Sequence, residues 1–285
     1  MSASMLFVPA SSPDKFAKAQ GGDAHALILD LEDSVPPDGK QQARENVVRM
    51  LGSRSSGQQL WVRVNSAGSG LLLQDLAAIV PQRPYGIVLP KCCGRDSLFP
   101  VACYLDALEA SAGIAIGQTR ILAIATETAA SLFRLSDYAG VTDRLWGLAW
   151  GGEDLGADMG VISNSEGGVY TDPFRLARSL CVLGAAAAGV RAIDAVTVAL
   201  KDTERVGREA QAAFRDGFSG KMAIHPAQIE AINHAFTFSS EKIAWARRVL
   251  AAFAANPGER ALQLDGQMID EPHAKQARRI LESLG

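Results

Sequence analysis

Short apolar runs that alternate with longer amphipathic segments predict an α/β fold for this chain, a (β/α)8 TIM barrel followed by a C-terminal helical extension. The runs lack strict polar alternation, as is typical of strands buried on both faces of a parallel sheet. The turn after the first run, at residues 9–13, reads PASSP, and the chain has no GxGxxG or Walker sequence. A length of 285 residues, 48% of them hydrophobic, is enough for a barrel of about 250 residues.

Each predicted strand is a short run dominated by Val, Ile, Leu, Ala or Trp, bounded by polar or turn residues. We expect eight strands, one for each position in the barrel. They are Leu6–Val8, Ala26–Leu31, Leu60–Val64, Gly86–Leu89, Ile121–Ala125, Leu145–Trp150, Ala192–Val196 and Lys221–Ile224.

The segments between these runs have the apolar spacing of helices that pack on a barrel. They include Lys40–Leu51, Gln74–Val80, Leu98–Ala110, Ala129–Tyr138, Phe174–Ala188 and Thr203–Phe214, with Ala227–Phe236 and Ser240–Ala255 after the last strand. We therefore predict a catalytic barrel over residues 1–256 and a C-terminal arm over residues 257–285. The arm is expected to be a short extended piece followed by a helix, which either docks on its own barrel or acts as a lid over a neighbouring subunit.

The charge balance and hydropathy exclude two classes of partner. Lys and Arg total 28 against 31 for Asp and Glu, a net charge of −3 without a basic run, so we expect no nucleic acid partner. The longest nearly uncharged stretch, Leu180–Val190, is much shorter than the ~20 apolar residues of a membrane span. The first residues, MSASMLFVPASS, lack the basic and apolar regions of a secretion signal, so we expect a cytoplasmic protein.

Polar residues follow the predicted strands at the end where a barrel of this type carries its active site. Most are carboxylates, accompanied by a few cations. They are Asp30, Glu32 and Asp33, Arg63 and Asn65, Lys91, Glu127, Glu153 and Asp154, Asp194 and His225.

Glu127 and Asp154 follow adjacent predicted strands, so they are expected to lie together. Two carboxylates with open coordination positions suit Mg²⁺, which usually retains several waters. An ordinary ion-pair network at the barrel rim is an equally good interpretation of the same residues.

Arg63 lies within the apolar sequence WVRVN, where an unpaired guanidinium would be costly to bury. We expect it to point into the barrel mouth, where its planar donors fit a carboxylate or an enolate-type oxygen. The alternative is that Arg63 and Lys91 neutralise Asp30, Glu32 or Asp33, and for Lys91 we favour this alternative.

Several segments, in order, resemble the HpcH/HpaI aldolase and citrate lyase β-subunit family, in its citrate-lyase-like branch. They are LFVPASSPDKFAKA, LILDLEDSVPPDGKQQAR, VRVN, GIVLPK, TET, WGGEDLGADMG, RAIDAV, GFSGKMAIHPAQI and LDGQMID. The resemblance covers nearly the whole chain, and the series in register is highly specific although each segment alone is weak.

The resemblance implies a barrel that uses Mg²⁺ to make or break a carbon–carbon bond next to a thioester. By the same resemblance, Glu127 and Asp154 are the metal ligands, and Glu127 also contributes to the substrate site. Arg63 is implied as the catalytic and substrate-binding arginine, and Glu32 and Asp33 as groups that hold the metal's waters.

The C-terminal LDGQMID segment is similar to that of malyl-CoA and citramalyl-CoA lyases, which act on free coenzyme A thioesters. This similarity implies that Asp270 reaches a neighbouring subunit's site as a catalytic acid or base, which favours the intersubunit lid, and a homotrimer or homohexamer is expected. The family often has Arg-Ser shortly before LFVP and Gly after it, where this chain has Ala3-Ser4 and Ala10. We therefore expect unusual coenzyme recognition with intact core chemistry.

The predicted function is the Mg²⁺-dependent cleavage of a 3-hydroxyacyl-CoA into an acyl-CoA and an α-keto acid, or the reverse condensation. One alternative is a citrate lyase β subunit, which cleaves citryl bound to an acyl carrier into oxaloacetate and the acetyl form of the carrier. The other is a barrel that binds a CoA ester or metabolite without turnover.

Overall fold

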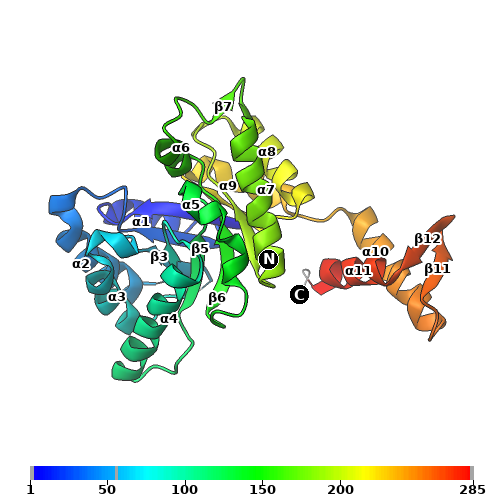
Figure 1. The fold of residues 1–285 in the computed structure, drawn as a ribbon, viewed down its shortest axis with the longest axis horizontal. Coiled ribbons are helices and arrows are strands. Elements are labelled where there is room, and N and C mark those ends of the chain that lie inside the picture. Colours follow the sequence, from blue (N-terminus) through cyan, green and yellow to red (C-terminus); the bar gives the residue numbers. More distant parts are fainter. Residues whose placement is uncertain (1–2, 55–56, 283–285) are drawn as a thin grey trace. The chain divides into compact units, whose positions relative to one another are not determined.

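A closed barrel of eight parallel strands forms the larger part of the chain, as predicted (Figure 1). The computed structural model of the protein describes residues 3–54 and 57–282. Neighbouring strands follow the order β1-β10-β9-β6-β5-β4-β3-β2. The strands are β1 (Ser4–Pro9), β2 (Ala26–Asp30), β3 (Gln59–Arg63), β4 (Gly86–Leu89), β5 (Arg120–Ile124), β6 (Leu145–Ala149), β9 (Arg191–Asp194) and β10 (Gly220–Ala223).

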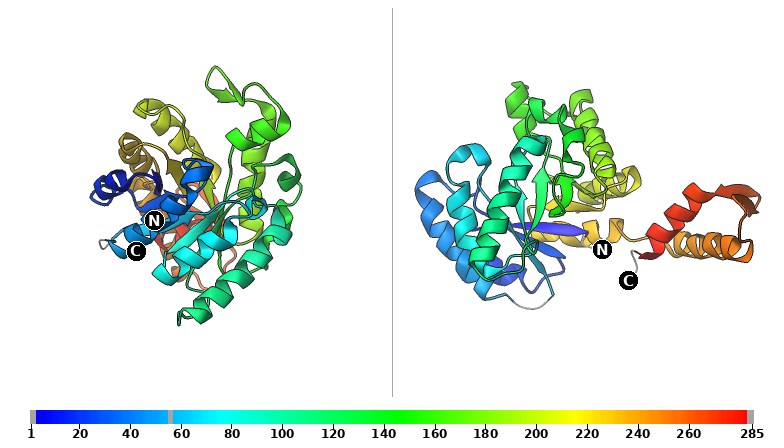
Figure 2. Two further views of the ribbon diagram at one scale, coloured as in Figure 1. Left: turned by 90° about the vertical axis from the view of Figure 1, so that its left-hand side faces the viewer. Right: turned by 60° about the horizontal axis from the view of Figure 1, so that its bottom comes forward.

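Helices surround this barrel and connect its strands (Figure 2). The α-helices of the barrel unit are α1 (Pro13–Ala19), α2 (Lys40–Gly52), α3 (Leu72–Ile79), α4 (Gly94–Ser111), α5 (Ala129–Leu132), α6 (Glu153–Met159), α7 (Asp172–Ala187), α8 (Thr203–Asp216) and α9 (Ile229–Ala235). Short 3-10 helices are η1 (Pro37–Gly39), η2 (Ala67–Ser69), η3 (Val80–Gln82), η4 (Leu135–Tyr138) and η5 (Pro226–Gln228), and β7 (Ser165–Glu166) pairs with β8 (Val169–Tyr170) as a small hairpin.

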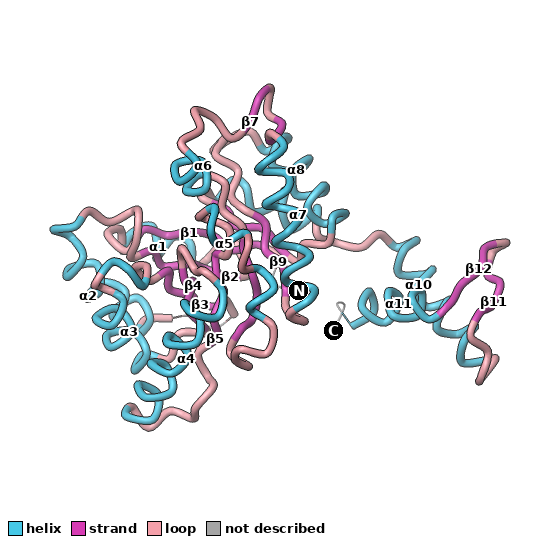
Figure 3. The backbone as a smooth tube through the Cα atoms, viewed as in Figure 1, coloured by secondary structure: helices cyan, strands magenta, loops and turns pink. Residues whose placement is uncertain are grey.

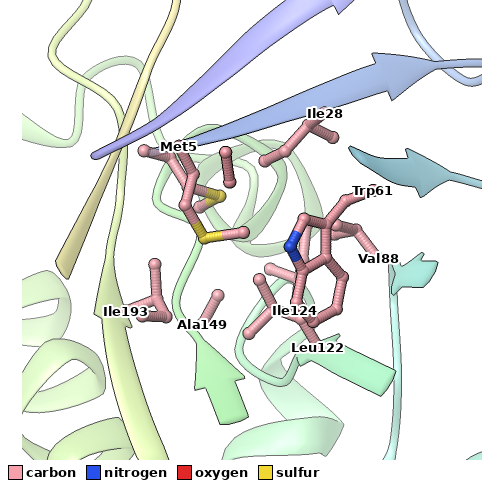
Figure 4. Close-up of a cluster of buried hydrophobic side chains, with 10 residues drawn as sticks. Met5, Ile28, Trp61, Val88, Leu122, Ile124, Ala149 and Ile193 are labelled. Carbon is pink, nitrogen blue, oxygen red and sulfur yellow. The ribbon is translucent and has the colours of Figure 1, made fainter. Parts of the chain in front are cut away.

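The inside of the barrel is filled by large apolar side chains from successive strands. Figure 4 shows Met5, Ile28, Trp61, Leu122 and Ile193 converging there, and each is at most 3% exposed. This packing explains the continuous apolar runs of the sequence, because both faces of each strand are covered. It also closes the interior below the strand ends, so the polar residues gather at the mouth.

The C-terminal residues form a second compact unit, which begins at Phe236. It contains α10 (Ser240–Ala255), the antiparallel strands β11 (Ala261–Leu264) and β12 (Gln267–Asp270), and α11 (Glu271–Glu282), which Figure 3 distinguishes by colour. Ala246 and Val249 of α10 pack with Ala277 and Ile280 of α11 around its own apolar cluster.

Three features differ from the sequence predictions. The boundary between the units follows Ala235 instead of residue 256, because α10 packs on α11. The single helix expected over residues 129–138 is instead two short helices, α5 and η4. The extended piece in the arm is a hairpin, whose turn at Asp265 and Gly266 has φ values of 52° and 77°.

Among the described residues, every helix is too short or too polar to cross a membrane.

Candidate active site

A cavity of about 420 Å³ lies at the carboxyl ends of the barrel strands. All of its lining residues belong to the barrel unit. They include Phe7, Asp30, Asp33, Arg63, Glu127, Trp150, Gly151, Gly152, Asp154 and Tyr170. The mouth of the barrel thus gathers Arg63, Glu127 and Asp154, the three residues that carry the sequence prediction.

Arg63, the last residue of β3, is held by carboxylates from the neighbouring strand end. Its Nε and Nη2 donate to the two oxygens of Asp30 across 2.7 and 2.8 Å, a bidentate pair. Its Nη1 lies 3.2 Å from both Glu32 Oε2 and Asp33 Oδ2, and its guanidinium carbon lies 4.8 Å from the centre of the Phe7 ring. Burial alone would raise the pKa of Asp30, but the bonds from Arg63 lower it below its ordinary value. Arg63 is therefore fixed in place and ionised.

Lys91 links carboxylates that come from three different strand ends. Its Nζ lies 3.0 Å from Glu32 Oε1 and 3.1 Å from Asp154 Oδ1. Its backbone adopts a φ of 51°, rare for a residue with a side chain, and its N–H donates to Glu127 Oε2 across 2.5 Å. The predicted neutralising role toward Glu32 agrees with this geometry, whereas the contacts with Glu127 and Asp154 were not predicted.

Glu127 is a buried carboxylic acid, 4% exposed, three residues after the end of β5. Burial, together with the nearby charges of Asp154 and Glu32, raises its pKa to about 8, although the bond from the Lys91 N–H and the Lys91 charge oppose this rise. Its position depends on Gly151, because a Cβ there would lie 2.9 Å from Glu127 Cγ. The pKa is elevated mainly because burial disfavours the ionised form, and the neighbouring carboxylates add to this effect.

Asp154 lies in the first turn of α6, and about a third of its side chain is exposed. Within the described ranges, no group of three or more His, Cys, Asp or Glu side chains is arranged around a common metal position. A site built on Glu127 and Asp154 would therefore need waters or substrate oxygens to complete it, which is how proteins commonly bind Mg²⁺. Glu32 Oε2 is buried and accepts no hydrogen bond among the described groups, although Arg63 Nη1 lies 3.2 Å away, so it can make a further polar contact. The donor set thus fits a hard divalent cation.

Glu32 and Asp33 contact Arg63 directly, and Glu32 also contacts Lys91, so they belong to the charge network of the cavity. Their predicted role toward a metal's waters remains a prediction. Asp270 is placed elsewhere, at the end of β12 in the C-terminal unit. There its Oδ1 lies 2.6 Å from Nδ1 of His273.

Tyr170 and Trp150 are among the cavity residues that the sequence analysis did not identify. Tyr170 comes from the β7–β8 hairpin, and Trp150, which follows β6, packs against its ring in a T-shaped arrangement with centroids 5.0 Å apart. The indole of Trp150 also donates to Asp194 Oδ1 across 2.7 Å. No local sequence signal marks Tyr170, because the hairpin strands have only two residues each.

A second cavity of about 680 Å³ adjoins the first and shares Phe7, Pro9 and Ile224 with it. It lies between α1 and the region around η5, and Lys15 and Lys18 of α1 are among its lining residues. The two cavities together offer an acidic pocket with an adjoining groove that has basic residues along one side.

Comparison with known proteins identifies relatives over nearly the whole chain. Citrate lyase subunit beta-like protein of Mycobacterium tuberculosis is 35% identical over 281 residues, 98% of this chain and 94% of the relative. Mitochondrial citramalyl-CoA lyase of Rattus norvegicus is 31% identical over 294 residues, 97% of this chain and 84% of the relative. The crystal structure of CitE from Mycobacterium tuberculosis in complex with magnesium, acetoacetate and coenzyme A matches with a TM-score of 0.80 and 33% identity, covering 98% of this chain and 97% of that one.

The family model described as HpcH/HpaI aldolase/citrate lyase matches residues 3–226, which span almost all of the barrel unit. The family model and the names of the relatives confirm both the predicted family and the predicted enzyme class, a carbon–carbon lyase. With the motifs, the barrel and the relatives in agreement, the chain belongs to the HpcH/HpaI aldolase/citrate lyase family.

Proposed function

We propose that this protein is a Mg²⁺-dependent lyase that cleaves a 3-hydroxyacyl-CoA, such as malyl-CoA or citramalyl-CoA, into an acyl-CoA and an α-keto acid. The observation that carries the proposal is the convergence of Glu127, Asp154 and Arg63 on one cavity. A relative named citramalyl-CoA lyase and a similar structure with magnesium and coenzyme A support the substrate class.

In the proposed reaction, the substrate hydroxyl gives its proton to solvent and becomes the keto group as the adjacent carbon–carbon bond breaks. The electron pair of that bond moves into the thioester to form an enolate. Mg²⁺ held by Glu127 and Asp154 would supply Lewis acidity toward the carboxylate and hydroxyl or keto oxygens of the keto-acid half. Arg63, fixed by Asp30, presents a preorganised positive charge to the oxygen that gains charge. Such preorganisation lowers the barrier because the guanidinium does not have to reorient during the reaction.

Asp270 of a neighbouring subunit would deliver a proton to the enolate carbon, or remove it in the condensation direction. The sequence resemblance of the LDGQMID segment supports this role. The side chain is about one third exposed in its own unit, so it is accessible to a partner.

The coenzyme portion of the substrate would occupy the groove beside the cavity, with Lys15 and Lys18 facing its phosphates. Replacing both lysines by Glu should raise KM for a CoA ester several-fold while kcat changes little. Arg208→Glu on α8, outside both cavities, is a charge-reversal control for a single position and should leave KM unchanged.

The test of the reaction is keto-acid release from a panel of purified 3-hydroxyacyl-CoA esters, followed as the phenylhydrazone with and without Mg²⁺. We expect Mg²⁺-dependent turnover, which Glu127→Ala abolishes while the far-UV circular dichroism is retained; Glu45→Ala on α2 is the control. Turnover only of citryl bound to an acyl carrier would instead establish the citrate lyase β-subunit alternative. Tight binding of CoA esters without turnover would establish the non-catalytic binding barrel.

A further inference from the structure

The indole of Trp150, in the wall of the cavity, is bonded to the carboxylate of Asp194. Asp194 ends β9, the neighbour of β6 in the barrel, and Trp150 follows β6. Their N–H···O bond measures 2.7 Å, and neither residue is more than 3% exposed. A buried indole N–H requires an acceptor, but a backbone carbonyl or a neutral side chain would be sufficient.

Asp194 is held ionised in this buried position by two cations. Lys221 Nζ, on β10 and 2% exposed, lies 2.8 Å from Asp194 Oδ2, and Arg178 Nε lies 3.1 Å from Oδ1. Burial would raise the pKa of Asp194, yet Lys221 and Arg178 lower it below its ordinary value. Well-packed apolar residues often stabilise a fold as well as buried ion pairs do, so stability alone does not explain this network.

The indole of Trp150 lies close to the Gly151–Asp154 segment. A Cβ on Gly152 would be 3.2 Å from Trp150 Cζ3, so the indole leaves little room for a side chain at this position. Gly152 is the N-cap residue of α6, and Asp154 is in the first turn of that helix. Between them and Trp150 lies Gly151, whose backbone packs on Glu127.

We propose that Asp194 is a positioning residue: through the Trp150 indole it fixes the Gly151–Asp154 segment, and thereby the relative placement of Asp154 and Glu127. The role of Asp154 toward a metal rests on the proposed function, whereas the mechanical link between Asp194 and the segment does not. Asp194 itself is absent from the lining of the cavity, so it acts through Trp150.

Trp150→Phe is the sharpest variant, because it removes the N–H and keeps a ring in the wall. We expect two protected amides, Gly151 N–H bonded to Thr126 Oγ1 and Gly156 N–H bonded to the carbonyl of Gly152, to exchange with solvent about tenfold faster. Losing a hydrogen bond to a charged group changes an equilibrium by about this factor or more. We also expect the Kd for Mn²⁺, measured by electron paramagnetic resonance as a probe for Mg²⁺, to rise by a similar factor. Trp146→Phe, in β6 and packed against Trp61, is the matched control and should change neither quantity.

Unchanged amide exchange in Trp150→Phe would overturn the proposal. Faster exchange with an unchanged Kd for Mn²⁺ would also overturn it, because the segment would then be loosened without consequence for Asp154. Asp194→Asn, which keeps an acceptor but loses the charge, should shift both readouts in the same direction. If Asp194→Asn does not fold, the Trp150→Phe variant alone tests the proposal. If the wild type binds no Mn²⁺, the proposed function fails, whereas amide exchange still tests the link between Asp194 and the Gly151–Asp154 segment.

Discussion

At the scale of single residues, the protonation of Glu127 affects the stability of the barrel and, through its proposed role as a metal ligand, the affinity for Mg²⁺. The carboxyl group has an ordinary pKa of 4.5 and a pKa of about 8 in the folded, metal-free protein. The folded state therefore binds a proton that the unfolded state has lost between these two values.

We predict that this proton makes the metal-free protein lose stability as pH rises. The contribution of Glu127 is complete below about pH 4.5 and is lost as pH rises through about 8. Urea unfolding from pH 5 to pH 8 with excess EDTA measures this dependence. Glu127→Gln, which stays neutral, should flatten the curve, and an equally steep curve in this variant would assign the effect to another group.

We also predict that the affinity for Mn²⁺ rises with pH up to about 8, because a metal must displace the proton from Glu127. Calorimetry in two buffers of different ionisation enthalpy should detect proton release at pH 7. The absence of proton release would show that Glu127 is already ionised before the metal binds.

Gly151→Ala should disturb the site at a single point. The added methyl would lie 2.9 Å from Glu127 Cγ, so Glu127 must move, and we expect at least a tenfold loss of kcat. Gly207→Ala in α8 meets nothing within 4 Å and should stabilise the protein by up to about 1 kcal/mol without changing kcat. Equal activity of the two variants would contradict the placement of Glu127.

At the scale of elements, the strands of the barrel were predictable because their residues are apolar on both faces. The run Ala26–Leu31, for example, differs from β2 by one residue at its end. The arm hairpin was not predictable in this way, because β11 and β12 are short and include Gln263 and Gln267. Its two strands are recognisable only once they are paired.

The turn of that hairpin gives a prediction for the C-terminal unit. Gly266 has a φ of 77°, so Gly266→Val should cost about 1–2 kcal/mol locally and speed amide exchange over Gln267–Asp270. Exchange in the strands of the barrel unit should not change. Gly21→Ala, at an uncrowded position without a positive φ, is the control.

In the candidate site too, some residues were predictable from a local sequence pattern and others were not. Glu127, Asp154 and Arg63 were identified because each follows or ends a strand, and parallel strands bring such positions to one edge. The contacts of Lys91 depend on a left-handed backbone conformation, and the bond between Trp150 and Asp194 depends on the pairing of β6 with β9. Neither is encoded in a local pattern of residues.

At the scale of the whole molecule, the proposed role of Asp270 predicts complementation between subunits. Asp270→Asn and Glu127→Ala should each be nearly inactive alone, because one would lack the proposed proton donor and the other the proposed metal ligand. After co-refolding, mixed oligomers should recover part of the wild-type kcat/KM, since some sites combine an intact cavity with an intact arm. No recovery, with mixing verified by mass spectrometry, would place Asp270 in its own subunit's site or outside catalysis.

Carboxylates outnumber cations around the mouth of the barrel, where Arg63 and Lys91 are the basic residues that pair with Asp30, Glu32, Asp33 and Asp154. An empty mouth with this balance repels the carboxylate of a keto acid, and a bound dication reverses the repulsion. We therefore expect a compulsory order of addition, with metal first and organic acid second. Initial-rate patterns with varied Mg²⁺ and keto acid would show this order. The carboxylates around the mouth would then prevent the keto acid from binding before the metal.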